Sequence, residues 1–191
     1  LQAFGTEEQK QQWLPLLASG QIHGAFCLSE PEAGSDATSQ KTTAIDMGDH
    51  YLVNGTKNWI TNGNTASFYI VIAQTDVEKK SKGINALIMT KDMPGFSVGP
   101  KEHKMGIRGS DTHSLMFNDV KVPKENILPN VQGLKGPLGC LSKARYGIAW
   151  GTLGAAMDCY DTALRYSQQR IQFDKPIGAF QLQQKKLAEM I

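Results

Sequence analysis

Residues 26–36 read FCLSEPEAGSD, a β-strand pattern that runs directly into a turn of proline, glycine and small hydroxyl residues. Such a turn presents backbone N–H groups and hydroxyls to a ligand, as a phosphate or another anionic group requires. Taken alone, the stretch is more simply an ordinary turn. Its meaning therefore depends on what surrounds it.

A second stretch, NGTKNWITNG at residues 54–63, follows within the same pattern of short β runs. Trp59 and Thr61 are two residues apart, so we expect them to project from the same face of a strand. By itself this arrangement is also compatible with a core tryptophan and a threonine at a strand end. The dipeptide Asn54-Gly55 predicts a β-hairpin, because a type I′ turn needs positive φ at both central residues.

The region from Ile22 to about Val122 has the texture of a β-domain. Short runs rich in β-branched and aromatic residues alternate with Gly, Asn and Asp signals, which predicts a central antiparallel barrel or sandwich. The runs are residues 25–29, 41–46, 51–53, 56–60, 68–74, 84–90 and 114–117. The lysine-rich stretch at residues 78–83 is predicted to be a solvated hairpin loop and not an anion site.

Helices flank this region on both sides. Thr6 and Gln9 fit a capping box, and the helix that they begin ends before Gly20, with Pro15 disturbing its last turn. Residues 124–139 are predicted to be a linker, followed by a helix from Ser142 to about Gln169 and an amphipathic helix from near Ala179.

The predicted fold class is therefore α+β and multidomain. Residues 1–20 are expected to end an N-terminal helical domain, residues 21–130 to form the β-domain, and residues 131–191 to begin a C-terminal helical bundle domain. Leu1 is not a methionine, and residues 181–191 stop within a helical pattern, so both ends look cut.

Composition excludes several classes of partner. The 191 residues carry a formal net charge of +2, which gives no electrostatic reason to expect nucleic acid. The three cysteines show neither CxxC spacing nor a metal-ligand pattern, which favours a reducing compartment and no metal site.

Three segments, taken in order, resemble the acyl-CoA dehydrogenase family: LSEPEAGSD, NGTKNWITNG, and RIQF followed by QLQQKKLAEM. In that family FAD accepts a hydride at N5 from the β-carbon of an acyl-CoA thioester, while a carboxylate removes the α-proton. The product is a trans-2-enoyl-CoA, and an electron-transfer flavoprotein takes the electrons. The resemblance also implies a homo-oligomer, most often a tetramer.

The resemblance assigns site residues position by position. Trp59 would pack against the flavin edge and Thr61 would bond near N5, while Arg170 and Gln181 match positions that bind the dinucleotide of a neighbouring subunit. Ser29 stands where the family usually has threonine, and Asp174 replaces a glycine. The full cofactor set is Phe26, Leu28, Ser29, Gly34, Ser35, Trp59, Ile60, Thr61, Arg170 and Gln181.

The resemblance also implies substrate contacts, namely Ser35, Leu138, Cys140, Leu141, Ser142 and Arg145. Lys143 could equally be an ordinary surface cation, and Arg145 is more simply one. No general base can be named. The family's usual base would lie beyond Ile191, its minority position is Ala144 here, and the carboxylates Glu30, Glu32 and Asp36 suit structural roles better. The 191 residues alone are therefore expected to be inactive.

The substrate preference is divided between the two halves of the chain. Up to about Ile127 the sequence resembles short-chain, butyryl-type dehydrogenases, whereas residues 133–191 resemble glutaryl-CoA dehydrogenase, whose product is decarboxylated to crotonyl-CoA. Because helices frame the acyl pocket in the family, we expect glutaryl-CoA. The alternatives are a short-chain dehydrogenase, an acyl-CoA oxidase, or a non-catalytic flavoprotein relative. The expected location is the bacterial cytoplasm or the mitochondrial matrix.

Overall fold

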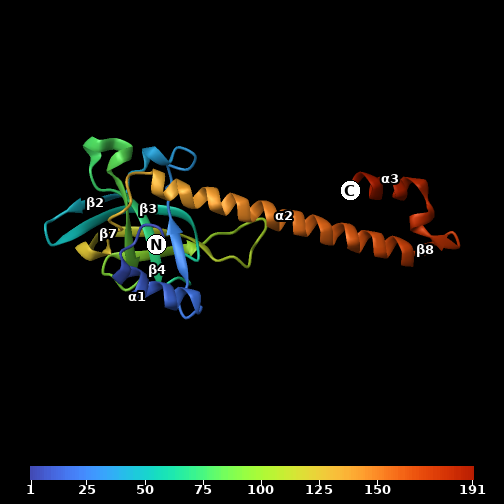
Figure 1. Ribbon diagram of the computed structural model, residues 1–191, viewed down its shortest axis with the longest axis horizontal. Helices are drawn as coiled ribbons and strands as arrows, with labels where there is room; N and C mark the ends of the chain where they lie inside the picture. Colours follow the sequence, from blue (N-terminus) through green and yellow to red (C-terminus); the bar gives the residue numbers. More distant parts are fainter. The chain divides into compact units, whose positions relative to one another are not determined.

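The longest strand pairing in the chain joins β3 (His50–Thr61) to β7 (Thr112–Pro123) in antiparallel register. The other edge of β3 pairs antiparallel with β2 (Thr43–Asp46), and β7 pairs antiparallel with β6 (Phe96–Lys101). In the computed structural model, which describes all residues from 1 to 191, these strands belong to one seven-stranded sheet (Figure 1).

The sheet is mixed and not purely antiparallel, which corrects the predicted strand arrangement. Strand β4 (Phe68–Gln74) pairs antiparallel with β5 (Ile84–Thr90), but parallel with both β1 (Gly24–Cys27) and β2. A parallel pairing needs a long connection. Residues 28–42, between β1 and β2, are long enough to let both strands meet β4 in the same direction. The α+β class itself is confirmed.

The core lies on the inner face of this curled sheet. Most residues of β4 and β5 are buried, in agreement with their continuous hydrophobic runs. Tyr69 is fully buried, and its hydroxyl donates to the carbonyls of Gly63 (3.0 Å) and Ala66 (2.8 Å). The Tyr69 ring also packs on Phe96, with 4.8 Å between ring centroids. Through Tyr69, the core therefore holds the segment that directly follows β3.

The hairpin predicted at Asn54-Gly55 is wrong, because both residues lie inside β3. A β-bulge between Val53 and Gly55 breaks the register with β7, and the Asn54 side chain bonds Asp119 on that strand. A Cβ on Gly55 would lie 2.4 Å from Oγ1 of Thr42. A glycine is therefore needed at this position because Thr42 packs closely against it, and not because the chain turns there.

The chain contains three α-helices. The capping box is confirmed at the start of α1 (Glu7–Ala18), and Pro15 is accommodated inside that helix. Helix α2 (Lys135–Gln169) begins seven residues before the predicted Ser142. Pro137 falls within its first turn, where a missing N–H costs no helical bond. None of the helices combines the length and apolarity needed to cross a bilayer.

The chain divides into two compact units, Leu1–Gly139 and Cys140–Ile191. The second contains most of α2, a two-stranded hairpin of β8 (Ile171–Gln172) and β9 (Lys175–Pro176), and α3 (Gln181–Glu189). The last helix thus starts two residues after the predicted Ala179.

Short 3₁₀ helices fill several connections: η1 (Ala37–Ser39), η2 (Val77–Gly83), η3 (Lys124–Asn126) and η4 (Ile177–Ala179). The second of these joins the antiparallel neighbours β4 and β5, so the hairpin connection predicted at residues 78–83 is confirmed.

Candidate functional site

The two β-domain motifs are adjacent in the structure. The backbone N–H of Asn58 donates to the carbonyl of Ser29 over 2.8 Å, and Nζ of Lys57 donates to the carbonyl of Leu28 over 3.0 Å. The turn that follows β1 is therefore bonded directly to β3. Segments that lie 29 positions apart in the chain form a single surface.

Trp59 and Thr61 are both exposed on this surface, while Ile60 between them is buried. A β-bulge interrupts the pairing with β7 between Lys57 and Ile60, and Trp59 in the bulge has φ 59°. For a bulky residue, such a conformation costs about 1–3 kcal/mol and is found mainly at functional sites. The predicted common face is confirmed. The core-tryptophan alternative is wrong, because Trp59 is 62% exposed.

The turn itself is held by its own backbone and carboxylates. Glu30 and Ala33 exchange two backbone hydrogen bonds, of 3.0 and 3.2 Å. Asp36 accepts from the hydroxyls of Ser39 and Thr38, which together hold the pKa of its carboxyl below the ordinary value. Gly34 and Ser35 are exposed between these anchors. The turn thus offers a fixed and open edge to a ligand.

A buried ion pair lies under the turn. Lys57 is fully buried, and its Nζ donates to Oε1 of Glu30 (2.7 Å) and to Oε1 of Gln40 (3.2 Å). Burial opposes ionisation of Glu30, but Lys57 and the backbone N–H of Lys41 hold the pKa of Glu30 below its ordinary value. Burial in turn lowers the pKa of Lys57, an effect that Glu30 opposes.

Beyond Thr61, a second polar network fixes the end of β3. Asp111 accepts from the backbone N–H groups of Asn64 (3.0 Å) and Thr65 (3.1 Å), and its other oxygen lies 2.8 Å from Nε2 of His113. Burial opposes ionisation of Asp111, but the bond from His113 and these N–H groups lower its pKa overall. Sequence analysis missed Lys57, Gln40, Asp111 and His113. Nothing in a hydropathy pattern distinguishes a buried lysine or a partly buried aspartate from an exposed one.

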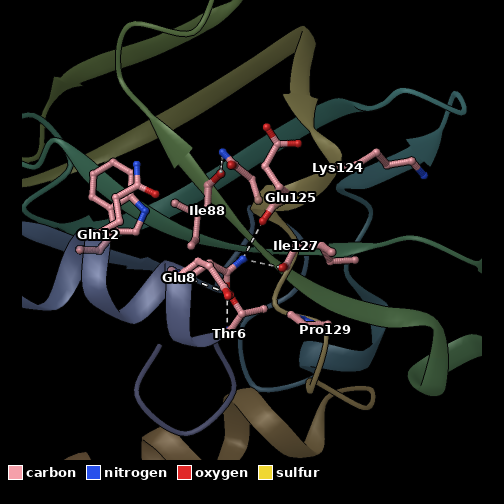
Figure 2. Close-up of a pocket in the computed structure, with 11 residues that line it drawn as sticks. Thr6, Glu8, Gln12, Ile88, Lys124, Glu125, Ile127 and Pro129 are labelled. Atoms are coloured by element: carbon pink, nitrogen blue, oxygen red, sulfur yellow. Dashed lines mark hydrogen bonds between the residues drawn. The ribbon is translucent and has the colours of Figure 1, made fainter.

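Two of the hollows on the first unit lie beside the turn and beside α1. A groove of about 640 Å³ adjoins the turn. It is lined by Thr38, Ser39, Gln40, Lys41, Thr43, Gln74, Val77, Lys80 and Ser81. The other hollow, of about 410 Å³, lies between α1 and the segment after β7, where Thr6, Ile88, Ile127 and Pro129 meet (Figure 2). It contains none of the predicted site residues.

The remaining predicted contacts lie on or beyond α2. Leu138 belongs to the first unit, while Cys140, Leu141, Ser142 and Arg145 follow it along the helix in the second. Gln181 is the first residue of α3 and lines a hollow of about 560 Å³ with Phe173, Ile177 and Phe180.

Arg170 precedes the β8–β9 hairpin, and its carbonyl accepts from the N–H of Ile177 over 2.9 Å. Phe173 and Asp174 form the two-residue turn of this hairpin, with φ 52° and 58°. Both central residues of a type I′ turn require positive φ. This requirement explains why a glycine, which Asp174 replaces, suits the position.

Comparisons with known proteins identify the family. The model of the acyl-CoA dehydrogenase middle domain matches residues 25–120, and that of the acyl-CoA dehydrogenase C-terminal domain matches residues 132–191. The chain belongs to the acyl-CoA dehydrogenase family.

Curated relatives are similar over nearly all of this chain. Mitochondrial isovaleryl-CoA dehydrogenase of Solanum tuberosum is 47% identical over 187 residues, which are 97% of this chain and 45% of that protein. Human mitochondrial short-chain specific acyl-CoA dehydrogenase is 44% identical over 188 residues, or 98% of this chain and 46% of the relative. The chain therefore spans about half the length of the curated relatives that it matches.

Solved structures show the same relationship. Glutaryl-CoA dehydrogenase from Mycobacterium smegmatis has a TM-score of 0.92 at 47% identity, covering 99% of this chain and 48% of that one. Butyryl-CoA dehydrogenase from Megasphaera elsdenii has a TM-score of 0.92 at 46% identity, covering 98% and 50%. A glutaryl-CoA dehydrogenase from M. smegmatis, 44% identical with a TM-score of 0.91, was solved in complex with FADH2, over 97% of this chain and 47% of that one.

Proposed function

We propose that this chain supplies the flavin-binding surface of an FAD-dependent acyl-CoA dehydrogenase, which converts an acyl-CoA to the trans-2-enoyl-CoA. The observation that carries the proposal is the strained, exposed Trp59 beside Thr61, bonded through Asn58 to the Ser29 turn. Family membership and the relative solved with FADH2 support FAD as the cofactor.

The exposed groups on this surface suit a flavin ring. The Trp59 indole offers a flat apolar face, and the Thr61, Ser29 and Ser35 hydroxyls can donate hydrogen bonds to ring heteroatoms or carbonyls. Ile60 and Leu28, both buried, support this surface from behind. Bound FAD supplies the hydride acceptor. The protein's part is to hold the ring in one orientation and to donate hydrogen bonds where electron density increases on reduction.

The α-proton needs a base from outside residues 1–191. Each carboxylate of the turn already has a partner: Glu30 pairs with Lys57, Glu32 with Lys41, and Asp36 with Thr38 and Ser39. A base must reach the proton that it removes, directly or through one water. We therefore assign no catalytic carboxylate here and place the base beyond Ile191.

Contacts with the thioester are proposed at Ser35 and along α2, at Leu138, Cys140, Leu141, Ser142 and Arg145. The groove at residues 38–43 adjoins Ser35 in sequence, and its hydroxyl and amide groups suit the polar arm of coenzyme A. Arg170 and Gln181 are proposed to bind the dinucleotide of a neighbouring subunit, because an arginine fork matches a pyrophosphate. This arrangement requires a homo-oligomer, for which we propose a tetramer, and an electron-transfer flavoprotein as acceptor.

For the substrate we propose glutaryl-CoA, on the strength of the resemblance in residues 133–191 and of the glutaryl-CoA dehydrogenases among the similar structures. A short straight-chain acyl-CoA is the second candidate, favoured by the human short-chain relative and by the butyryl-CoA dehydrogenase structure. The relatives include bacterial and mitochondrial proteins, which fits the proposed cytoplasmic or mitochondrial location.

Turnover of an acyl-CoA panel by the full-length enzyme tests the proposal. Glutaryl-CoA should give the highest kcat/KM and release carbon dioxide, and the reduced enzyme should reoxidise slowly in air. A far higher kcat/KM for butyryl-CoA without carbon dioxide release would replace glutaryl-CoA by the second candidate. Fast reoxidation by air would indicate an oxidase, and a colourless full-length protein would indicate a non-catalytic relative.

A further inference from the structure

The buried Lys57 ammonium has an acceptor for each of its three protons. These are the Leu28 carbonyl at 3.0 Å, Oε1 of Glu30 at 2.7 Å and Oε1 of Gln40 at 3.2 Å. An ammonium group has three donors and no acceptor, so its bonding capacity is fully used. Lys57 therefore has no donor left for a substrate.

The same network closes the long connection between β1 and β2 at both ends. Leu28 and Glu30 stand at the start of that connection. Near its other end, Gln40 bonds Lys57, and the backbone N–H groups of Lys41 and Thr42 donate to the Glu30 carboxylate at 2.6 and 3.1 Å. Residues 28–42 are therefore a loop tied at its base to one side chain of β3.

Lys57 stands two residues before Trp59, on the buried side of the bulge that exposes the indole. The strand neighbour between them, Asn58, bonds the carbonyl of Ser29. The position of the loop and the position of the bulge are consequently set by the same few atoms. A shift of Lys57 would move Ser29 and Trp59 relative to each other.

Stability alone is a weak reason for a buried ion pair. Removing two charges from water is costly, and a well-packed apolar pair of similar volume is often as stable or more stable. Such pairs are better explained where they specify one geometry. Here the geometry that they specify is the relation between the loop and the bulge.

We propose that Lys57, with Glu30 and Gln40, acts as a positioning residue for the bound flavin, holding Ser29 and Trp59 in one fixed relation. The inference rests on the proposed function, because it concerns the same flavin surface. Lys57 touches neither cofactor nor substrate in this account. It acts through the two segments that do.

Two variants of the full-length enzyme test the inference. Lys57→Met keeps most of the length of the side chain and removes all three bonds. Gln40→Leu keeps the ion pair and the backbone bonds from Lys41 and Thr42 to Glu30, and it removes only the bond between Gln40 and Lys57. It therefore loosens the far end of the loop in a protein that retains its buried charges in balance.

Gln9→Leu is the matched control. Gln9 is buried, and its amide donates two bonds of 2.7 and 2.8 Å to the carbonyls of Glu125 and Ile127. Gln9 also lines the hollow between α1 and the segment after β7. The variant removes a buried polar tie between distant segments, as Gln40→Leu does, but at a place that holds no predicted site residue. It should lower the melting temperature without changing the flavin.

The readouts are the visible spectrum of the bound flavin and the rate constant for its reduction by acyl-CoA, both expressed per bound flavin. Normalising in this way removes the effect of partial unfolding. We expect Gln40→Leu to lower the reduction rate constant about threefold and Lys57→Met about tenfold or more, with a shifted spectrum, because small misplacements of reacting groups are costly. KM for the acyl-CoA should change less than the rate constant.

If Gln40→Leu showed the wild-type flavin spectrum and the wild-type rate constant per bound flavin, the inference would be overturned. This outcome decides the question whether or not Lys57→Met gives a soluble protein. The same change of spectrum and rate in Gln9→Leu would also overturn it, because the effect would then belong to any loss of stability. If the wild-type enzyme bound no flavin, or if acyl-CoA did not reduce the bound flavin, the proposed function itself would fail.

Discussion

Asn58 donates its backbone N–H to the carbonyl of Ser29 over 2.8 Å, and this bond joins the strand that carries Trp59 to the turn that carries Ser35. The two flavin segments inferred from sequence are therefore one structural element. A ligand that contacts one of them lies within reach of the other.

Replacing Trp59 by glycine or by alanine should separate the effect of backbone strain on stability from the effect of the indole on the flavin. The residue is exposed with φ 59°, so Trp59→Gly relieves strain of about 1 kcal/mol, whereas Trp59→Ala retains it. Both variants should alter the flavin spectrum and slow flavin reduction in the full-length enzyme. Thermal unfolding should nevertheless show Trp59→Gly at least as stable as Trp59→Ala. A lower melting temperature for the glycine variant would mean that the bulge carries no strain.

Replacement of Gly55 should be far more damaging than replacement of Gly48. Both have positive φ, but an added Cβ meets Thr42 at 2.4 Å in the first case and nothing within 4 Å in the second. We expect Gly48→Ala to cost about 1 kcal/mol for its backbone conformation, and Gly55→Ala about 2 kcal/mol more because of overpacking. Urea unfolding measures both, and equal losses would contradict the close approach of Thr42 to Gly55 in β3.

Asp174→Gly should stabilise the β8–β9 hairpin. Asp174 has φ 58°, where glycine avoids the penalty of a side chain, so we expect a gain of about 0.5–1 kcal/mol. Lys175→Gly is the control, since it places glycine in β9 and should destabilise the same hairpin. Melting temperatures of the two variants should move in opposite directions. A shift in the same direction would show that the turn geometry is not what determines stability.

Stability at low pH should depend on Glu30. Its folded pKa lies below the ordinary 4.5, so the folded state binds fewer protons than the unfolded state once the pH falls below that value. The contribution of Glu30 is thus complete above about pH 4.5 and is lost as the pH falls through its folded pKa. The free energy of unfolding, measured as the pH falls, should decrease less steeply in Glu30→Gln than in the wild type. At neutral pH the variant should already be less stable. An unchanged slope would mean that other carboxyls control acid unfolding.

Local signals explain most of what the sequence predicted correctly. The bonds between Thr6 and Gln9 are a short-range pattern, and Trp59 and Thr61 follow the simple alternation of a strand. The local signal at Asn54-Gly55 gave a wrong prediction, because the pairing of β3 with β2 and β7 overrides the preference of this dipeptide for a turn. Strand β6 was missed, since Gly99 and Pro100 interrupt its pattern.

Long-range polar contacts were beyond prediction. The bonds from Lys57 to Leu28 and Glu30 join residues 29 and 27 positions apart, and no spacing rule connects them. The parallel pairing of β1 and β2 with β4 likewise depends on the path of residues 28–42 and not on their hydropathy. The motifs located the surface, but the network that supports it emerged only from the fold.

Hydrogen–deuterium exchange of the full-length apoenzyme, with and without added FAD, tests the central claim most directly. Residues 26–36 and 58–63 should both become protected when FAD binds, since the flavin covers the turn and the bulge together. Protection confined to other regions, such as the hollow between α1 and residues 124–129, would contradict the assignment of this surface as the flavin site.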